Sequence, residues 1–364
     1  MTDTFYSYHN LPDFAVPPGE TLIETLESLH MTQADLAKRT GRPLKTINEI
    51  IRGVTRILPE TALQFEQVLG VPASFWLNLE RNYREILARR EEKVKLEQQV
   101  EASELYPVAQ LRTLGFLPDV RKPLEIVHAL LSFFGVVDLQ IVPGLYEAAQ
   151  LSFKKSSAHP VNEYATYAWL RQGEIKAKDI TCAPYDKAVF MQNLKKIRDV
   201  IPDQTTGFIQ EMISLCAASG VALVFVPEVK GCRSYGVSRW LTPDKALIML
   251  SLRQKSDDHL WFTFFHEAAH TLFHKKKKIF IDGLDGQVQD ENETEANAFS
   301  ADFMIPRGAM STLTDKFTIL RADIIAFAKA HSITPGIVLG RLQHEGHVPF
   351  QTPLNNLKKY YEWT

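Results

Sequence analysis

Apolar positions recur at helical spacing along most of the chain, and continuous apolar, β-branched runs interrupt this pattern only beyond residue 220. The helical spacing predicts helices at 123–134, 162–177, 206–219, 257–273, from 291 to a point before Pro306, 322–331 and 335–343. The apolar runs at 221–226, 235–241 and 246–250 predict a small antiparallel sheet. The pattern therefore favours a mainly helical α+β fold.

Breaks in the pattern divide the chain into four parts. Short amphipathic segments separated by Gly41, Gly53 and residues 70–72 predict a small helical domain over 17–83. The following residues are rich in Arg, Lys, Glu and Gln, which suggests an exposed helix at the start of a helical connecting region over 84–204. The sheet and the later helices form a second domain at 205–345. A tail at 346–364 ends in aromatic residues that we expect to dock on that domain.

Composition limits the partners of the chain. Its net charge of -2 gives no global polycationic character, so any contact with nucleic acid has to come from a local patch. No apolar stretch reaches the ~18 residues of a membrane span, and residues 1–18 lack the pattern of a leader. We therefore expect a cytoplasmic protein with no membrane partner. Cys182, Cys216 and Cys232 are too few and too widely spaced for a disulfide framework.

The sequence His266-Glu267-Ala268-Ala269-His270 lies within the apolar helix predicted at 257–273. Residues four apart share one face of a helix, so His266 and His270 can direct imidazole nitrogens to one tetrahedral zinc ion. Glu267 then lies beside the open coordination position, where it can take a proton from water and pass it to a leaving amine. The motif predicts Zn2+ as cofactor and peptide hydrolysis as the reaction.

A catalytic zinc site needs a third protein ligand, and the acidic helix that begins near residue 291 supplies candidates. We expect Glu295 to be this ligand, because Ala298, Phe299 and Phe303 after it would pack inward and turn it towards the first helix. Glu291 is the second choice, whereas Glu293 is expected to point away.

Other residues near the motif have simpler explanations. His274 extends the histidine spacing, but eight residues of helix span ~12 Å, too far for His266 and His274 to share one ion with bonds of ~2.1 Å. Cys232 is a thiol alternative as ligand, although a buried core cysteine is the more ordinary interpretation. Tyr235 is a candidate for stabilising an oxyanion or else a plain strand residue. The two histidines could also be ordinary residues of a buried helix, an interpretation that the acidic second helix makes less favourable.

A second constellation lies in the N-terminal domain. Thr32 and Asp35 form a capping box at the start of one helix, Gly41 makes a turn, and Pro43 introduces a second helix. Leu44, Ile47 and Ile51 are expected on its inward face. This arrangement is typical of a helix-turn-helix whose second helix enters the major groove of DNA.

The outward residues of the second helix are the candidates for reading bases, and the basic residues around them are candidates for contacting phosphates. The base-reading candidates are Lys45, Thr46, Asn48 and Glu49, and the phosphate candidates are Lys38, Arg39, Arg42, Arg52 and Arg56. Gln33, at the start of the first helix, is a further DNA-binding candidate. The alternative is a helical bundle that binds protein. If it binds DNA, we expect a homodimer on a palindrome, with Phe75, Trp76 and Leu77 either at the dimer surface or in the core.

These motifs resemble those of two known families. Residues 17–83 resemble the Xre-type domain of HigA-type antitoxins, a lambda-repressor-like bundle, through Thr32–Ala37, Ile47–Gly53 and Ser74–Leu79. Residues 205–345 resemble an ImmA/IrrE-type metallopeptidase domain, which has a zincin-like fold, through Trp261–Glu267 and Glu295–Phe299.

The first resemblance implies a bacterial or phage regulator that binds double-stranded operator DNA, represses its own operon and neutralises a HigB-type ribonuclease toxin. The second implies a peptidase of narrow range, since relatives of this domain cleave a particular repressor. The fusion of the two domains leaves three options: cleavage of the chain itself, cleavage of another regulatory protein, or a non-proteolytic antitoxin whose zincin-like domain binds a toxin or senses a signal.

Overall fold

The computed structural model describes residues 15–146, 162–202, 207–251, 253–274, 280–282 and 291–362. The chain forms two compact units, Met1–Val100 and Glu101–Thr364. The boundary between the two units lies within the connecting region expected at 84–204. Its first residues continue the last long helix of the first unit, and the rest packs within the second unit.

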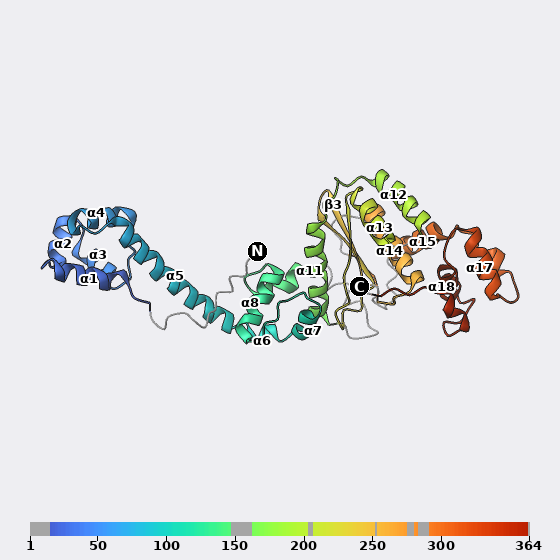
Figure 1. Cartoon of the computed structure of the whole chain (residues 1–364), viewed down its shortest axis with the longest axis horizontal. Helices are drawn as coiled ribbons and strands as arrows, with labels where there is room; N and C mark the ends of the chain where they lie inside the picture. Colours follow the sequence, from blue (N-terminus) through green and yellow to red (C-terminus); the bar gives the residue numbers. More distant parts are fainter. Residues whose placement is uncertain are drawn as a thin grey trace. The chain divides into compact units, whose positions relative to one another are not determined.

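The first unit is a helical bundle (Figure 1). Its helices are α1 (Pro18–Ser28), α2 (Gln33–Thr40), α3 (Leu44–Ile51), α4 (Pro59–Leu69) and α5 (Ala73–Glu97). Local sequence explains the bounds of α2, because Thr32 and Asp35 complete the expected capping box and Gly41 ends the helix at a φ of 65°. The core includes Leu22, Ile47, Phe65 and Trp76, all fully buried.

The second unit contains a sheet with helices on both faces (Figure 1). The helices before the sheet are α6 (Val100–Ser103), α7 (Val108–Thr113), α8 (Pro123–Phe134), η2 (Leu139–Ile141), α9 (Val142–Leu145), α11 (Glu163–Asp179), α12 (Lys187–Val200) and α13 (Phe208–Ala217). Those after it are α14 (Asp257–Phe273), α15 (Glu291–Met304), α16 (Ser311–Thr314), α17 (Arg321–Ala330), α18 (Pro335–His344) and η3 (Pro353–Leu357).

The sheet has four strands in the order β1-β3-β2-β4. They are β1 (Val221–Phe225), β2 (Gly236–Thr242), β3 (Lys245–Leu250) and β4 (Phe280–Asp282). The short turn between β2 and β3 makes that pair antiparallel, but the longer segment between β1 and β2 lets the chain return, so that β1 and β3 are parallel. The sheet is thus mixed: the expected antiparallel pairing is present between β2 and β3 and between β2 and β4, but not between β1 and β3.

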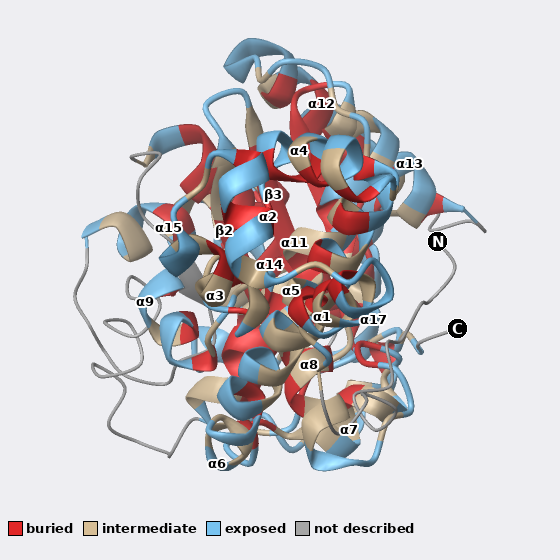
Figure 2. Ribbon diagram, turned by 90° about the vertical axis from the view of Figure 1, so that its left-hand side faces the viewer, coloured by how far each residue is buried: buried red, intermediate tan, exposed pale blue. Residues whose placement is uncertain are grey.

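Alternation along β1 and β3 separates two cores. Val221 and Leu223 face the helices α12 to α14, whereas Ala222 and Val224 face α11 and the helices before it. Both faces are covered, which explains the continuous apolar runs of these strands. Figure 2 shows the burial of the sheet and of α14.

The residues at the start of α14 connect this helix with the start of α18 and with the tail. Asp257 is fully buried, and its carboxylate accepts hydrogen bonds from Thr334 Oγ1 (2.6 Å) and from the backbone N–H of Lys359 (3.1 Å). Asp258 forms an ion pair of 2.7 Å with Lys358. The tail therefore docks on this domain as expected, although Trp363 lies outside the described residues.

Among the described residues, no single helix is long and apolar enough to span a membrane. By length and composition alone, two bent pairs would suffice, Pro123–Phe134 with Leu139–Leu145 and Arg321–Ala330 with Pro335–His344.

Candidate metal centre and DNA-binding helices

The helix α14 carries His266, Glu267 and His270 into the interior of the second unit. Their exposed fractions are 2%, 0% and 2%. The Nε2 atoms of the two histidines lie 2.9 Å apart, because the side chains leave the same face of the helix one turn apart. The expected juxtaposition of the two imidazoles is therefore present.

The carboxylate that completes this cluster is Glu293. Its Oε2 lies 3.2 Å from His266 Nε2 and its Oε1 lies 3.5 Å from His270 Nε2. Among the described residues, His266, His270 and Glu293 form the group of side chains able to hold one metal ion. The expectation that Glu293 points away is wrong.

Glu295, the expected third ligand, lies elsewhere. Its carboxylate contacts His274 Nε2 at 3.3 Å, and its side chain is 59% exposed. The reason lies in the rotation of α15, whose buried stripe runs through Ala296, Ser300 and Met304. Glu293 precedes Ala296 by three residues and so shares that face, whereas Glu295 is turned away from it by about 100°. Glu291, the second choice, is exposed and is not in the cluster.

A partly buried hydrogen bond joins α15 to α14. Ser300 Oγ donates to the backbone oxygen of Phe262 at 2.8 Å. Phe299 and Phe303 are only partly buried where they pack against the core. They therefore do not define the inward face of α15, contrary to the expectation that turned Glu295 towards α14.

The donor atoms fit a zinc ion. Two imidazole nitrogens and one carboxylate are a common set of protein ligands at catalytic zinc. Burial lowers the pKa of His270 to about 4, so the ring is neutral at pH 7 and keeps the lone pair that a metal needs. Burial favours a raised pKa for Glu293, but its hydrogen bonds and charge interactions with His266 and His270 hold that pKa well below the usual range.

The neighbouring side chains support this cluster without joining it. His274 Nδ1 lies 2.7 Å from His270 Nδ1, on the ring nitrogen opposite the cluster, where a partner orients a ligand imidazole. Glu267 lies against β2. A Cβ atom on Gly236 would be 2.9 Å from Glu267 Oε1 and 2.6 Å from Thr263 Cγ2.

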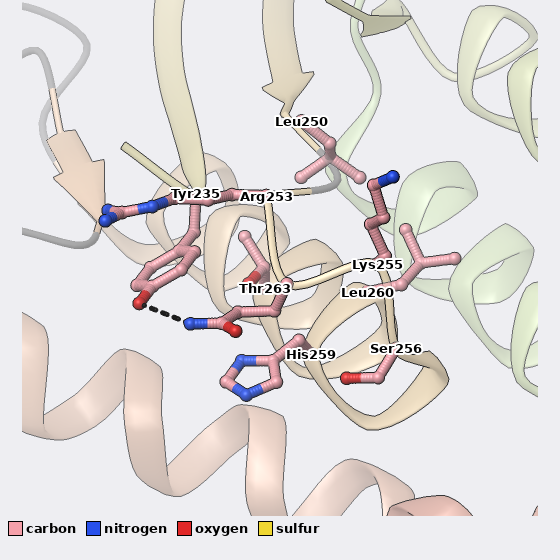
Figure 3. Close-up of a pocket in the computed structure, with 9 residues that line it drawn as sticks. Tyr235, Leu250, Arg253, Lys255, Ser256, His259, Leu260 and Thr263 are labelled. Carbon is pink, nitrogen blue, oxygen red and sulfur yellow. Dashed lines mark hydrogen bonds between the residues drawn. The ribbon is translucent and has the colours of Figure 1, made fainter. Parts of the chain in front are cut away.

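The two alternatives for metal or oxyanion chemistry lie outside the cluster. Cys232 is fully buried in the core between α11 and the sheet, and burial raises the pKa of its thiol to about 12. The ring of Tyr235 stacks on the ring of His259, with the two centroids 5.8 Å apart. The hydroxyl of Tyr235 accepts a hydrogen bond from Gln254 Nε2 at 3.1 Å (Figure 3). Neither residue belongs to the cluster of His266, His270 and Glu293.

In the first unit, α2, Gly41 and α3 form the expected helix-turn-helix. The inward residues of α3 are Ile47 and Ile50, with Ile51 partly buried. Leu44 was expected to be inward but is 45% exposed. It is the first residue of α3 and lies at the edge of the bundle. Trp76 is a core residue, whereas its neighbour Phe75 is 42% exposed.

Most candidates for DNA contact are exposed or half-buried, whereas two of them make hydrogen bonds within the domain. The side chains of Lys38, Arg39, Lys45, Arg52 and Arg56 are exposed, and Gln33, Thr46 and Asn48 are half-buried. Two others hold the domain together. Arg42 Nε donates to Gln64 Oε1 at 2.5 Å, and Glu49 Oε2 accepts from Thr55 Oγ1 at 2.9 Å. Glu49 also lies 3.9 Å from Lys45 Nζ.

A buried carboxylate that was not among the expected site residues supports the loop after α3. Glu80 on α5 accepts a hydrogen bond from the backbone N–H of Ile57 at 3.1 Å and pairs with Arg84 at 2.6 Å. Arg84 in turn donates to the backbone oxygen of Gly53 at 2.9 Å. The available signal was an acidic and a basic residue four positions apart, the spacing of an ion pair on a helix, but the boundary predicted between residues 83 and 84 separated them.

Comparison with known proteins gives two family matches. Residues 22–76 match the helix-turn-helix family model, and residues 229–343 match a peptidase family model described as the IrrE N-terminal-like domain. These matches confirm the resemblances drawn from the sequence. None of the curated proteins matches the chain.

Several solved structures are similar to part of the chain. An addiction module antidote protein of a HigA family from Coxiella burnetii is 32% identical over 23% of this chain and 94% of that chain, with a TM-score of 0.22. A putative antidote protein of a plasmid maintenance system from Nostoc punctiforme is 30% identical over 23% and 91%, also with a TM-score of 0.22. The Pseudomonas aeruginosa antitoxin HigA, solved with the higBA promoter, is 26% identical over 24% and 95%, again with a TM-score of 0.22.

Proposed function

For a chain that joins a helix-turn-helix domain to an IrrE N-terminal-like domain, we propose a DNA-binding transcriptional regulator that is also a zinc-dependent endopeptidase. The peptidase cleaves a specific regulatory protein or the chain itself. The observation that carries this proposal is the convergence of His266, His270 and Glu293 beside the buried Glu267.

In this mechanism His266, His270 and Glu293 hold the zinc ion. The ion, when bound, supplies a Lewis acid for the scissile carbonyl and for the attacking water. Glu267 follows the first ligand on the same helix and acts as general base, taking a proton from the water. It then returns the proton to the nitrogen of the leaving amine, so the peptide bond breaks with one water consumed.

For DNA binding, α3 is the recognition helix. Lys45 on α3 and Arg52, the residue directly after this helix, are exposed and basic, whereas Glu49 faces the loop that follows the helix. Thr46 and Asn48 supply polar groups for base edges, and the exposed Lys38, Arg39 and Arg56 supply charge for phosphates. Arg42 contributes to the position of α4 through Gln64 as well as to the basic surface.

The peptidase is tested by comparing protein N-termini, by mass spectrometry, in cells that express the native chain or its Glu267→Gln form. New termini that depend on Glu267 establish the peptidase and identify its substrate, including the chain itself. Identical termini in the two cultures, with zinc bound in both proteins, would contradict the proposal.

DNA binding is tested with the DNA upstream of the protein's own gene. The double variant Lys45→Ala with Arg52→Ala is expected to weaken binding and to reduce the dependence of affinity on salt, by about 0.9 in the log–log slope for each phosphate that the protein no longer neutralises. The charge-matched control is Arg81→Ala with Lys95→Ala, because both residues are exposed on α5 outside the helix-turn-helix. An equal decrease in affinity for both double variants would reject α3 as the recognition helix.

A further inference from the structure

A large cleft lies between α14, α15 and α18 in the second unit. Its volume is about 480 Å³, within the range of ligand-binding clefts. All three helices contribute apolar side chains to its lining, Phe262 on α14, Met304 on α15 and Ile337 on α18, beside polar side chains such as Asn297 and His344. We call it the α14–α18 cleft.

The cleft adjoins the candidate metal centre. The ring of Phe262, which lines the cleft, stacks against the ring of His266 with centroids 6.1 Å apart. Thr263 also lines the cleft. A Cβ atom on Gly236 would lie within 3 Å of both Thr263 Cγ2 and Glu267 Oε1, so the side chains of Thr263 and Glu267 are neighbours. A group bound in the cleft would therefore lie next to the residues proposed to cleave a peptide bond.

The lining contains a carboxylate and a guanidinium that are each paired with a group of opposite charge. Asp258 is paired with Lys358 at 2.7 Å, and Arg341 is paired with Glu345 at 2.5 Å. Each pair compensates the charge, although Asp258 Oδ1 and Arg341 Nη1 are buried without a hydrogen-bond partner among the described residues. The apolar part of the lining, formed by Phe262, Ala301, Met304, Ile305, Ile337 and Phe350, is able to receive an uncharged apolar group.

The mouth of the cleft adds a further apolar group. Phe350 belongs to the lining and is 69% exposed. The buried side chain of Gln343 holds the chain beside it, donating to the backbone oxygen of Pro349 at 3.2 Å. An exposed ring held at the entrance of an apolar cleft favours an apolar occupant.

We infer that the α14–α18 cleft binds a large apolar side chain, such as Phe, Leu or Met, of a polypeptide substrate beside the bond to be cleaved. This inference rests on the proposed peptidase function and adds its specificity. The substrate segment is extended or locally unfolded, so that one side chain enters the cleft while the backbone passes the metal centre.

Binding tests the inference separately from activity. The full chain with Glu267→Gln, loaded with zinc, is titrated calorimetrically with acetylated five-residue alanine peptide amides that carry Phe, Leu or Glu at the centre. The Phe and Leu peptides are expected to bind at least about tenfold more tightly than the Glu peptide, since burial of one large apolar side chain is sufficient for such a factor. Equal binding of all three peptides would overturn the inference.

Variants locate the binding. Ala301 is a lining residue that is only partly buried, so Ala301→Trp fills the cleft without removing core atoms. It is expected to abolish the preference for Phe and Leu, whereas Ala326→Trp, at an exposed position of α17 outside the lining, is expected to leave it unchanged. Phe350→Ser, at a position that is 69% exposed, is expected to weaken binding of the Phe peptide several-fold. A preference unchanged in both cleft variants would reject the α14–α18 cleft as the site.

The outcomes separate this inference from the proposed function. Glu267-dependent cleavage with no apolar preference in binding or in the cleaved sequences would leave the peptidase standing and overturn the inference. Preferential binding of the Phe and Leu peptides that Ala301→Trp abolishes, without any Glu267-dependent cleavage, would reject the peptidase and keep the cleft as an apolar peptide site.

Discussion

Gly236 and Glu267 lie so close that a Cβ atom at position 236 would be 2.9 Å from Glu267 Oε1. The first residue of β2 and the proposed general base can share this space only because position 236 carries no side chain. The same Cβ would be 2.6 Å from Thr263 Cγ2, one turn earlier on α14. Gly236 is therefore a positioning residue for Glu267.

Gly236→Ala is expected to displace the carboxylate of Glu267 and to lower the rate of Glu267-dependent cleavage by about 10²-fold, as small misplacements of reacting groups do. Zinc stoichiometry is expected to stay at the parent value, because position 236 is not among the residues of the cluster. Gly144→Ala is the matched control, since a Cβ there meets no atom within 4 Å. A rate unchanged by Gly236→Ala would reject the positioning role.

Glu293→Ala and Glu295→Ala test which carboxylate holds the metal. We expect Glu293→Ala to lower zinc affinity by more than about 10²-fold, the upper range for loss of a group that only supports a ligand. Glu295→Ala is expected to cost about tenfold or less, because Glu295 contacts His274 and not the two clustered histidines. Competition with a chromogenic chelator measures both, and a larger effect at Glu295 would restore the sequence-based assignment.

Removal of zinc is expected to destabilise the second unit alone. A ligand that binds only the folded state stabilises it by about 2.7 kcal/mol when its free concentration is 100 times its Kd. All three proposed ligands lie in the second of the two compact units. Scanning calorimetry with and without a chelator should show one transition that shifts and one that does not. Two unchanged transitions would mean that the chain holds no zinc.

Lys358→Ala is expected to destabilise the second unit by about 3–5 kcal/mol, the range for breaking a largely buried ion pair. The side chains of Lys358 and Asp258 are each only 10% exposed, so the carboxylate would lose its partner in a poorly hydrated position. Lys359→Ala is the control, because Lys359 is exposed and contacts Asp257 through its backbone N–H. Urea unfolding compares the two variants, and equal midpoints would show that the tail is not held by this pair.

Glu80→Gln is expected to destabilise the first unit by about 1–3 kcal/mol, because it weakens buried hydrogen bonds to Ile57 and Arg84. It is also expected to weaken DNA binding, since these bonds hold the loop after α3. Glu85→Gln, at a carboxylate that is 49% exposed, is the control and should change stability by no more than about 0.5 kcal/mol. Unfolding and DNA titration measured together separate an effect on folding from an effect on DNA recognition.

The sequence alone determined the elements and the chemistry that depend on neighbours along the chain. The capping box of Thr32 and Asp35 and the left-handed Gly41 fixed α2, and the apolar runs located β1, β2 and β3 to within one residue. The juxtaposition of His266 and His270 followed from helical geometry, because two residues four apart must share a face. These features need no information about distant parts of the chain.

The tertiary structure decided what depends on how separate elements pack. Three glutamates at 291, 293 and 295 stand at the start of α15, and apolar residues occur on more than one side of that helix. The sequence pattern therefore left its rotation open, and only the packing of Ala296 and Ser300 against α14 selected Glu293. The pairing of Asp258 with Lys358, 100 positions later, and the α14–α18 cleft arise in the same way. Periodicity specifies which residues of one helix lie together, whereas the relative rotation and displacement of two helices come from the fit of their side chains.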